Sequence, residues 1–273
     1  MSITINTNVM SLSAQRSLGA TQARLGGNLS RLSSGQRINT AADDAAGLAI
    51  SERFKAQIRS MGQAERNAND GISLAQTAEG AMNEISGVMV RMRELAVQSA
   101  NGTLGATERG FLDDEAQALV AEIDRISTVT EFNGIKLLDG TYSSDLQVGI
   151  GATVDDRIAV AIGATDFATL AGAAVDLTTQ ACAQTALGTL DGAIDALSGT
   201  RAALGTVQNR LQVSIANLGA ARENVSAANS RIRDVDVAAE SADMTRNNIL
   251  MQAGVSVLAQ ANQAPSVALS LLR

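Results

Sequence analysis

The chain has no histidine and no tryptophan, and only one cysteine, one proline, one tyrosine and four phenylalanines among 273 residues. A lone cysteine, Cys182, excludes an intrachain disulfide. Without histidine, the usual catalytic triads and zinc sites are excluded as well. Proline costs about 3 kcal/mol inside a helix, so the single Pro265 leaves room for very long helices. We therefore expect no catalytic, cofactor-binding or metal site.

The scarcity of rings favours slender helix-on-helix packing, because aromatic side chains fill wide globular cores by burying about 150–250 Å² each. The net charge of −7 argues against a nucleic-acid partner, since phosphate binding needs a basic face. No stretch approaches 18 uncharged apolar residues, so we expect no membrane span. The first residues lack a basic region followed by an apolar run, so we expect no cleavable signal peptide.

Seven-residue repeats of apolar side chains dominate both ends of the chain. They predict coiled-coil helices. The first run is Leu18, Leu25 and Leu32. A helix from about 45 to 100 would be on the order of 80 Å long, and a second is predicted from about 107 to 130. The longest stripe lies near the C-terminus: Leu190, Leu197, Leu204, Leu211, Leu218, Val225 and Ile232.

The middle of the chain has a different pattern. Asn133-Gly134 and Asp139-Gly140 are turn dipeptides. Residues 146–150 and 158–162 alternate like strands, and Asp155-Asp156 between them is suited to a hairpin turn. We predict a short exposed hairpin and loop segment over 141–185.

Charge is distributed unequally between the two ends. Residues 1–42 carry four arginines and no acid. We hypothesise that the ends pack antiparallel, with inter-terminal ion pairs joining Arg31 and Arg37 to Asp234, Asp236 or Glu240. The alternative is a solvated charged face.

Several long motifs, in order along nearly the whole chain, resemble bacterial flagellin. They are 28–39 (NLSRLSSGQRIN), 41–50 (AADDAAGLAI), 93–103 (RELAVQSANGT), 239–244 (AESADM), 249–263 (ILMQAGVSVLAQANQ) and 269–273 (LSLLR). The resemblance implies a mainly α fold, a long antiparallel coiled-coil rod with a small β-hairpin that assembles into a helical filament. It also implies an inner tube domain (1–42 with 235–273) and an outer helical spoke domain (43–140 with 186–234), in a short form without large outer domains.

The implied function is structural and not enzymatic: a secreted, extracellular subunit that polymerises into the bacterial flagellar filament for motility. The implied partners are further copies of the chain or sister flagellins, the hook–filament junction protein, the filament cap and an export chaperone. We predict that the terminal helices fold on assembly, because each has an apolar side with no partner in a lone thin rod. The assembly stripe is expected to include the leucines, valine and isoleucine of the seven-residue repeats above together with Leu258, Leu269, Leu271 and Leu272.

Three other functions compete with this one. A hook–filament junction protein would share the helical ends without forming the long filament. A secreted coiled-coil effector or needle component would not explain the paired terminal motifs. An enzyme would need a deep pocket with convergent polar groups, for which the sequence gives no residues.

Overall fold

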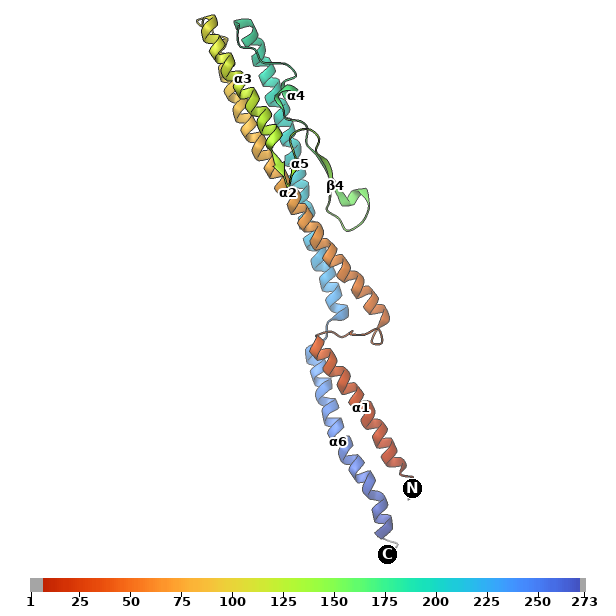
Figure 1. Cartoon of the computed structure of the whole chain (residues 1–273). Helices are drawn as coiled ribbons and strands as arrows, with labels where there is room; N and C mark the ends of the chain where they lie inside the picture. Colours follow the sequence, from red (N-terminus) through yellow and green to blue (C-terminus); the bar gives the residue numbers. More distant parts are fainter. Residues whose placement is uncertain (1–6, 271–273) are drawn as a thin grey trace. The chain divides into compact units, whose positions relative to one another are not determined.

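The computed structural model describes residues 7–270, with side chains described for residues 7–263. Most of this part is α-helical, as Figure 1 shows, and the predicted mainly α class with a small antiparallel β element is confirmed. The elements in chain order are α1 (Val9–Ser34), α2 (Ala45–Ser99), α3 (Ala106–Val129), β1 (Glu131–Phe132), β2 (Ile135–Lys136), β3 (Ser143–Gln147), η1 (Val154–Asp156), β4 (Arg157–Ala161), α4 (Phe167–Ala171), α5 (Gln180–Arg233) and α6 (Val237–Ser270).

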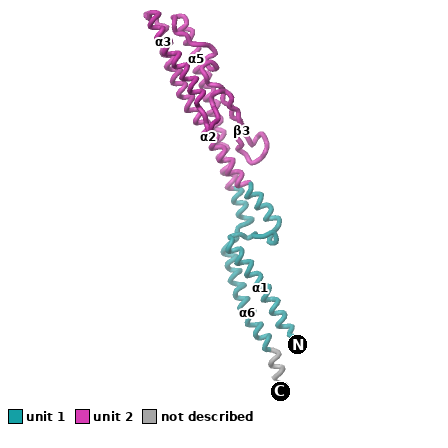
Figure 2. The backbone as a smooth tube through the Cα atoms, viewed as in Figure 1, with its two compact units in different colours: residues 1–56, 224–273 teal, residues 57–223 magenta. Residues whose placement is uncertain are grey.

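The chain forms two compact units, coloured separately in Figure 2. Unit 1 is made of residues 1–56 and 224–273, and unit 2 of residues 57–223. The division falls inside helices α2 and α5, whereas the sequence placed a domain boundary in the loops that precede α2 and follow α5. Each unit therefore contains a part of α2 and a part of α5.

Local sequence explains where the helices begin and end. Asn8 caps α1 by accepting the amide of Ser11 at 3.1 Å, and Gly35 ends it in the left-handed conformation with φ 70°. Asp44 precedes α2 and accepts the amide of Gly47 at 2.9 Å. Asp236 precedes α6 and accepts the amide of Ala238 at 3.0 Å. These caps satisfy amides that have no partner in the first helical turn.

Two antiparallel hairpins follow α3. Asn133 and Gly134 both have positive φ, 51° and 76°, which is the two-residue turn that joins β1 to β2. In the second hairpin Ser143 pairs with Ala161 and Gln147 with Arg157. The strands β3 and β4 are shifted toward the N-terminus relative to those predicted from alternation, β3 by three residues and β4 by one.

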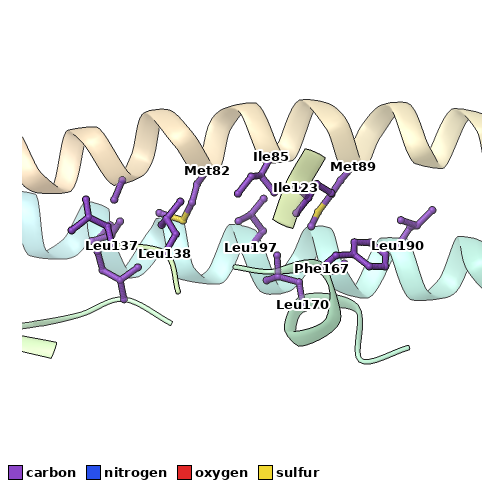
Figure 3. Packing of buried hydrophobic residues seen from close by; sticks show 14 of the residues in the cluster. Met82, Ile85, Met89, Ile123, Leu137, Leu138, Phe167, Leu170, Leu190 and Leu197 are labelled. Atoms are coloured by element: carbon purple, nitrogen blue, oxygen red, sulfur yellow. The ribbon is translucent and has the colours of Figure 1, made fainter. Parts of the chain in front are cut away.

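The core of unit 2 lies where α2, α3 and α5 meet the segment that links α3 to α5. Figure 3 shows methionines and isoleucine of α2 facing leucines of α5, with α3 and the linking segment closing the sides. The largest fully buried side chains are aliphatic or methionine, as the composition predicts: Met82, Ile85, Met89, Met92, Leu95, Ile123, Leu137, Leu138, Ile162, Leu177, Leu190 and Leu197.

The segment 141–185 is less exposed than the sequence suggested. It contains the short helix α4 and contributes Phe167, Leu170 and Leu177 to the core of unit 2. Leu177 is held by its amide, which donates to the carboxylate of Asp113 in α3 at 2.8 Å, and by its carbonyl, which accepts the buried Ser99 hydroxyl of α2 at 2.6 Å. The apolar residues here lack periodicity, so only the tertiary partners decide that they are buried.

Candidate assembly surface

Helices α1 and α6 pack side by side and antiparallel within unit 1 (Figure 1). Their facing side chains follow a three-four spacing along both helices, as in a two-stranded coiled coil. Most of these seam residues are only half-buried, because no other helix packs along this pair among the described residues. They are Ala14, Leu18, Thr21, Leu25 and Leu32 on α1, and Met244, Met251, Gly254, Leu258 and Ala261 on α6.

The fully buried residues of this pair, among those whose side chains are described, are polar. Asn28 and Asn247 are 6% and 9% exposed, and the Asn247 side-chain amide donates to the Asn28 carbonyl oxygen across the seam at 3.3 Å. Ser11 is 7% exposed and donates its hydroxyl to Asn262 at 2.7 Å. The Asn8 side-chain amide donates to the Ala261 backbone carbonyl at 2.7 Å. Polar layers thus lie toward both ends of the seam, with apolar residues between them.

The outer sides of α1 and α6 expose large apolar side chains to solvent. Those more than 48% exposed are Val9, Met10, Leu12 and Leu29 on α1, and Val237, Ile249, Leu250, Val255 and Val257 on α6. An open groove of about 750 Å³ runs between the helices and is lined by Val9, Met10, Leu18, Leu250 and Val257 among others. A contiguous apolar surface of this kind marks a contact with another molecule.

A group of charged and polar side chains holds the loop between α1 and α2. Arg31 lies 3.4 Å from Glu240 and 3.7 Å from Asp43. The Asp43 carboxylate also accepts the backbone amide and the hydroxyl of Thr40, at 2.9 and 3.0 Å. These hydrogen bonds from Thr40, with smaller contributions from the Asn39 amide and the Arg31 charge, lower the pKa of Asp43 below its ordinary value of 3.8.

The segment that connects α5 to α6 lies beside the loop between α1 and α2. Gln36 forms a backbone bridge with Asp234, and the Arg37 amide donates to the Arg233 carbonyl at 2.6 Å. The half-buried Arg233 guanidinium donates to Gln36 at 3.0 Å and to Glu52 at 2.5 Å. These contacts join the start of α2, the end of α5 and the loop within unit 1.

The structure gives the residues of the hypothesised ion pairs different roles. Arg31 lies beside Glu240, as described above. The Arg37 side chain donates to the carbonyl of Ile232 at 2.8 Å, and it forms no salt bridge with an acid within the described residues. Asp234 takes part through its backbone, and Asp236 caps α6.

The predicted assembly stripe divides into groups. Leu190, Leu197, Leu204 and Leu211 are at most 2% exposed and belong to the core of unit 2, and their part in assembly stays a prediction. Their partners are within the same chain, in α2 and the segment after α3. The residues that remain half-buried are Leu18, Leu25, Leu32, Leu218, Val225, Ile232 and Leu258. The side chains of Leu269, Leu271 and Leu272 lie outside the described residues.

Sequence reasoning missed several exposed apolar residues of α1 and α6, including Met10, Leu29 and Leu250. They stand beside the seven-residue stripe and not on it, so a search for the stripe alone passes over them. Their signal is an apolar residue at a heptad position that a two-helix seam does not cover.

The described part of the chain contains no group of three or more acidic or cysteine side chains suited to a metal ion. Over the same residues, no helix combines the length and apolar character needed to cross a membrane.

Comparison with known proteins gives matches over almost the whole chain. The family described as the bacterial flagellin N-terminal helical region matches residues 5–143, and the bacterial flagellin C-terminal helical region matches residues 187–272. The chain is 48% identical over 271 residues to a flagellin of Halalkalibacterium halodurans, covering 98% of this chain and 99% of that protein. It is 44% identical over 284 residues to the flagellar filament 33 kDa core protein of Treponema phagedenis, with 98% and 99% covered.

Solved structures agree with this. The crystal structure of Bacillus cereus flagellin matches 56% of this chain and 88% of that chain, with a TM-score of 0.50 and 35% sequence identity. A putative flagellar hook-associated protein of Vibrio parahaemolyticus matches 70% of this chain and 100% of that chain, with a TM-score of 0.61. Its 14% identity shows a shared fold alone.

Proposed function

The chain belongs to the bacterial flagellin family, and from this premise we propose how it assembles. It is a structural subunit of the extracellular bacterial flagellar filament and not an enzyme. The proposal concerns which surfaces join the subunits and when the terminal helices become ordered. The observation that carries it is the apolar groove between α1 and α6, whose lining includes the exposed Val9, Met10, Leu250 and Val257.

In the proposal, α1 and α6 form the inner tube domain, over residues 1–42 and 235–273, and neighbouring subunits cover their apolar sides. The helical parts 43–140 and 186–234 form the outer spoke domain. A contact between two different surfaces of identical chains repeats without closing, which yields an open filament. The partners at the filament's ends and before export are the junction protein, the cap and a chaperone.

The terminal helices fold when the filament forms. Ordering the backbone costs roughly 1–2 kcal/mol per residue, while apolar burial gains about 25 cal/mol per Å². Within one chain the α1/α6 seam residues stay half-buried, and the side chains that are buried there are polar. Burial against neighbours adds the apolar contact that this pair lacks.

The junction-protein alternative differs in one testable property, the ability to elongate. Purified chain added to short filament seeds is expected to extend them into long tubes visible by electron microscopy. A chain that stays monomeric beside active seeds would favour the junction protein.

A substitution in the groove tests the surface itself. Leu250→Ser removes an apolar side chain that is 49% exposed in the free chain. We expect the monomer concentration left at equilibrium with filaments to rise about fivefold to tenfold, because each 1.4 kcal/mol is a factor of ten. Gln252→Ser is the matched control: it lowers helix propensity at an exposed polar position two residues away. Equal effects of the two variants would show that the groove is not covered in the filament.

A further inference from the structure

Residues of the α1/α6 seam repeat with the same period on both helices. Leu18, Leu25 and Leu32 are seven apart, and so are Met244, Met251 and Leu258. Sliding α6 along α1 by seven residues would move Leu18 from Gly254 to Ala261 or Asn247 and would keep the repeats of both helices facing the seam. The apolar part of the seam therefore specifies that the helices pair, but not which of the heptad-related registers they adopt.

We propose that the buried Asn28–Asn247 pair selects the register of this seam and so decides which side chains the tube domain presents to its neighbours. In the observed register the two amides meet at 3.3 Å, each less than 10% exposed. The pair lies between apolar layers on one side and the Arg31–Glu240 contact on the other. A single buried asparagine layer is the best-attested device for fixing register in coiled coils.

Each alternative register separates the two amides from one another. A slip of one heptad in either direction would set Asn28 opposite Gly254 or Glu240, and Asn247 opposite Gly35 or Thr21. Glycine offers no side-chain partner, so the slip that sets Asn28 opposite Gly254 and Asn247 opposite Gly35 leaves both amides without one. A buried amide without a partner loses its hydrogen bonds to water and regains none. The opposite slip draws Glu240 away from Arg31, which it contacts at 3.4 Å in the observed register. These losses disfavour the slipped registers, although the repeats of both helices still face the seam.

Register matters for assembly because the groove depends on it. In the observed register Leu18 lies against Gly254, whose absent side chain leaves room for it: a Cβ at Gly254 would stand 3.2 Å from Leu18 Cδ1. In the same register Val9, Met10 and Val257 all line the groove. This inference rests on the proposed folding of α1 and α6 during assembly, when the register has to be chosen.

Disulfide trapping in filaments measures the register directly. In a Cys182→Ser background, Leu18→Cys with Gly254→Cys reports the observed register. Leu18→Cys with Ala261→Cys reports a slip of one heptad, because those positions are separated by about a further 10 Å along the helix, beyond the reach of a disulfide. Filaments mixed from two single-cysteine chains identify any disulfide that joins neighbouring subunits.

The test compares the natural asparagine pair with Asn28→Leu plus Asn247→Leu. We expect the natural pair to give only the observed-register disulfide and the leucine pair to give both disulfides. The leucine pair should still polymerise, with a residual monomer concentration no higher than that of the natural chain, because it replaces two amides by apolar side chains. Asn28→Leu alone leaves Asn247 buried without a partner, and we expect it to raise that concentration about tenfold.

Thr21→Leu is the matched control, since it makes a different seam layer apolar without removing a hydrogen bond between helices, and we expect it to keep one register. The proposal is overturned if the leucine pair gives only the observed disulfide, if the natural chain gives both, or if the leucine pair fails to polymerise while the natural chain does. Failure of the natural chain itself to polymerise on seeds would instead contradict the proposed function.

Discussion

Alanine substitutions at two leucines of the α5 stripe should affect the stability of unit 2 very differently. Leu204 and Leu218 are two heptads apart on one helix, and alanine has the same helix propensity at both. Leu204 is 2% exposed, whereas Leu218 is half-buried. The sequence pattern treats them alike, so any difference between them reports their packing.

The expected magnitudes follow from burial. Replacing a buried leucine by alanine costs about 2–5 kcal/mol, because it removes apolar contacts and leaves a cavity. Leu218→Ala should cost roughly 1 kcal/mol, about half of the 1.5–3 kcal/mol gained by fully burying such a side chain. For a folding unit of about 150–250 residues, 1 kcal/mol lowers Tm by roughly 2–4 °C. With about 3 kcal/mol for Leu204→Ala, a value inside that range, we expect Tm to fall by roughly 6–12 °C, against roughly 2–4 °C for Leu218→Ala.

Thermal unfolding of depolymerised protein, followed by far-ultraviolet circular dichroism, measures both shifts in one experiment. The monomer is required because filament contacts would add their own stabilisation. Shifts within about 2 °C of each other would refute the reasoning, since they would mean that the two leucines are equally buried in solution.

Two further predictions concern unit 2 and the loop. A Cβ at Gly71 would collide with the Leu146 side chain and stand 3.3 Å from Leu211, while nothing lies within 4 Å of a Cβ at Gly80. Gly80→Ala should therefore stabilise unit 2 by about 1 kcal/mol. Gly71→Ala should lower the stability of unit 2 by about 1–3 kcal/mol relative to Gly80→Ala, and it should speed amide hydrogen exchange in β3. Equal stabilities of the two variants would contradict this. The lowered pKa of Asp43 adds stability that is present above the ordinary value of 3.8 and is lost as pH falls through the lower folded value. Sedimentation measures the fraction of protein in filaments between about pH 5 and pH 3. This fraction should fall less steeply with acid for Asp43→Asn than for the natural chain. Identical curves would contradict a stabilising role of the Asp43 carboxylate.

Helix positions were the most predictable feature of the fold. The helix predicted from about 45 to 100 is α2, Ala45–Ser99, and the one predicted from about 107 to 130 is α3, Ala106–Val129. Periodicity and local capping determine these boundaries, and both are contained in a short stretch of sequence. The Asn133-Gly134 turn was predictable for the same reason, because two positive φ angles in succession favour that dipeptide.

Features that depend on distant partners were not predictable from local pattern. The strand β3 ends at Gln147 because the amides of Val148 and Gly149 both donate to the Asp156 carbonyl, at 2.9 and 2.8 Å, which ends the regular ladder. The apolar residues of α4 are buried by α3 and its neighbours, which no periodicity in that segment reveals.

The assembly surface was predicted in kind but not residue by residue. A seven-residue stripe identifies a face that needs a partner, and for the first four leucines of the α5 stripe the structure shows contacts within the same chain. The stripe through Leu18 and Leu25 does face α6, yet Asn28 and Asn247 are invisible to a search for apolar residues. Their pairing becomes evident only once the two ends of the chain lie side by side.

Amide hydrogen exchange of α1 and α6, compared between monomer and filament, tests the central claim most directly. Local unfolding exposes amides to exchange, so the method separates helices that are stable alone from those that need neighbours. We expect fast exchange over residues 9–34 and 237–263 in the monomer, strong protection of both in the filament, and protection of the buried part of α2 and α5 in both states. Strong protection of α1 and α6 in the monomer would contradict folding on assembly.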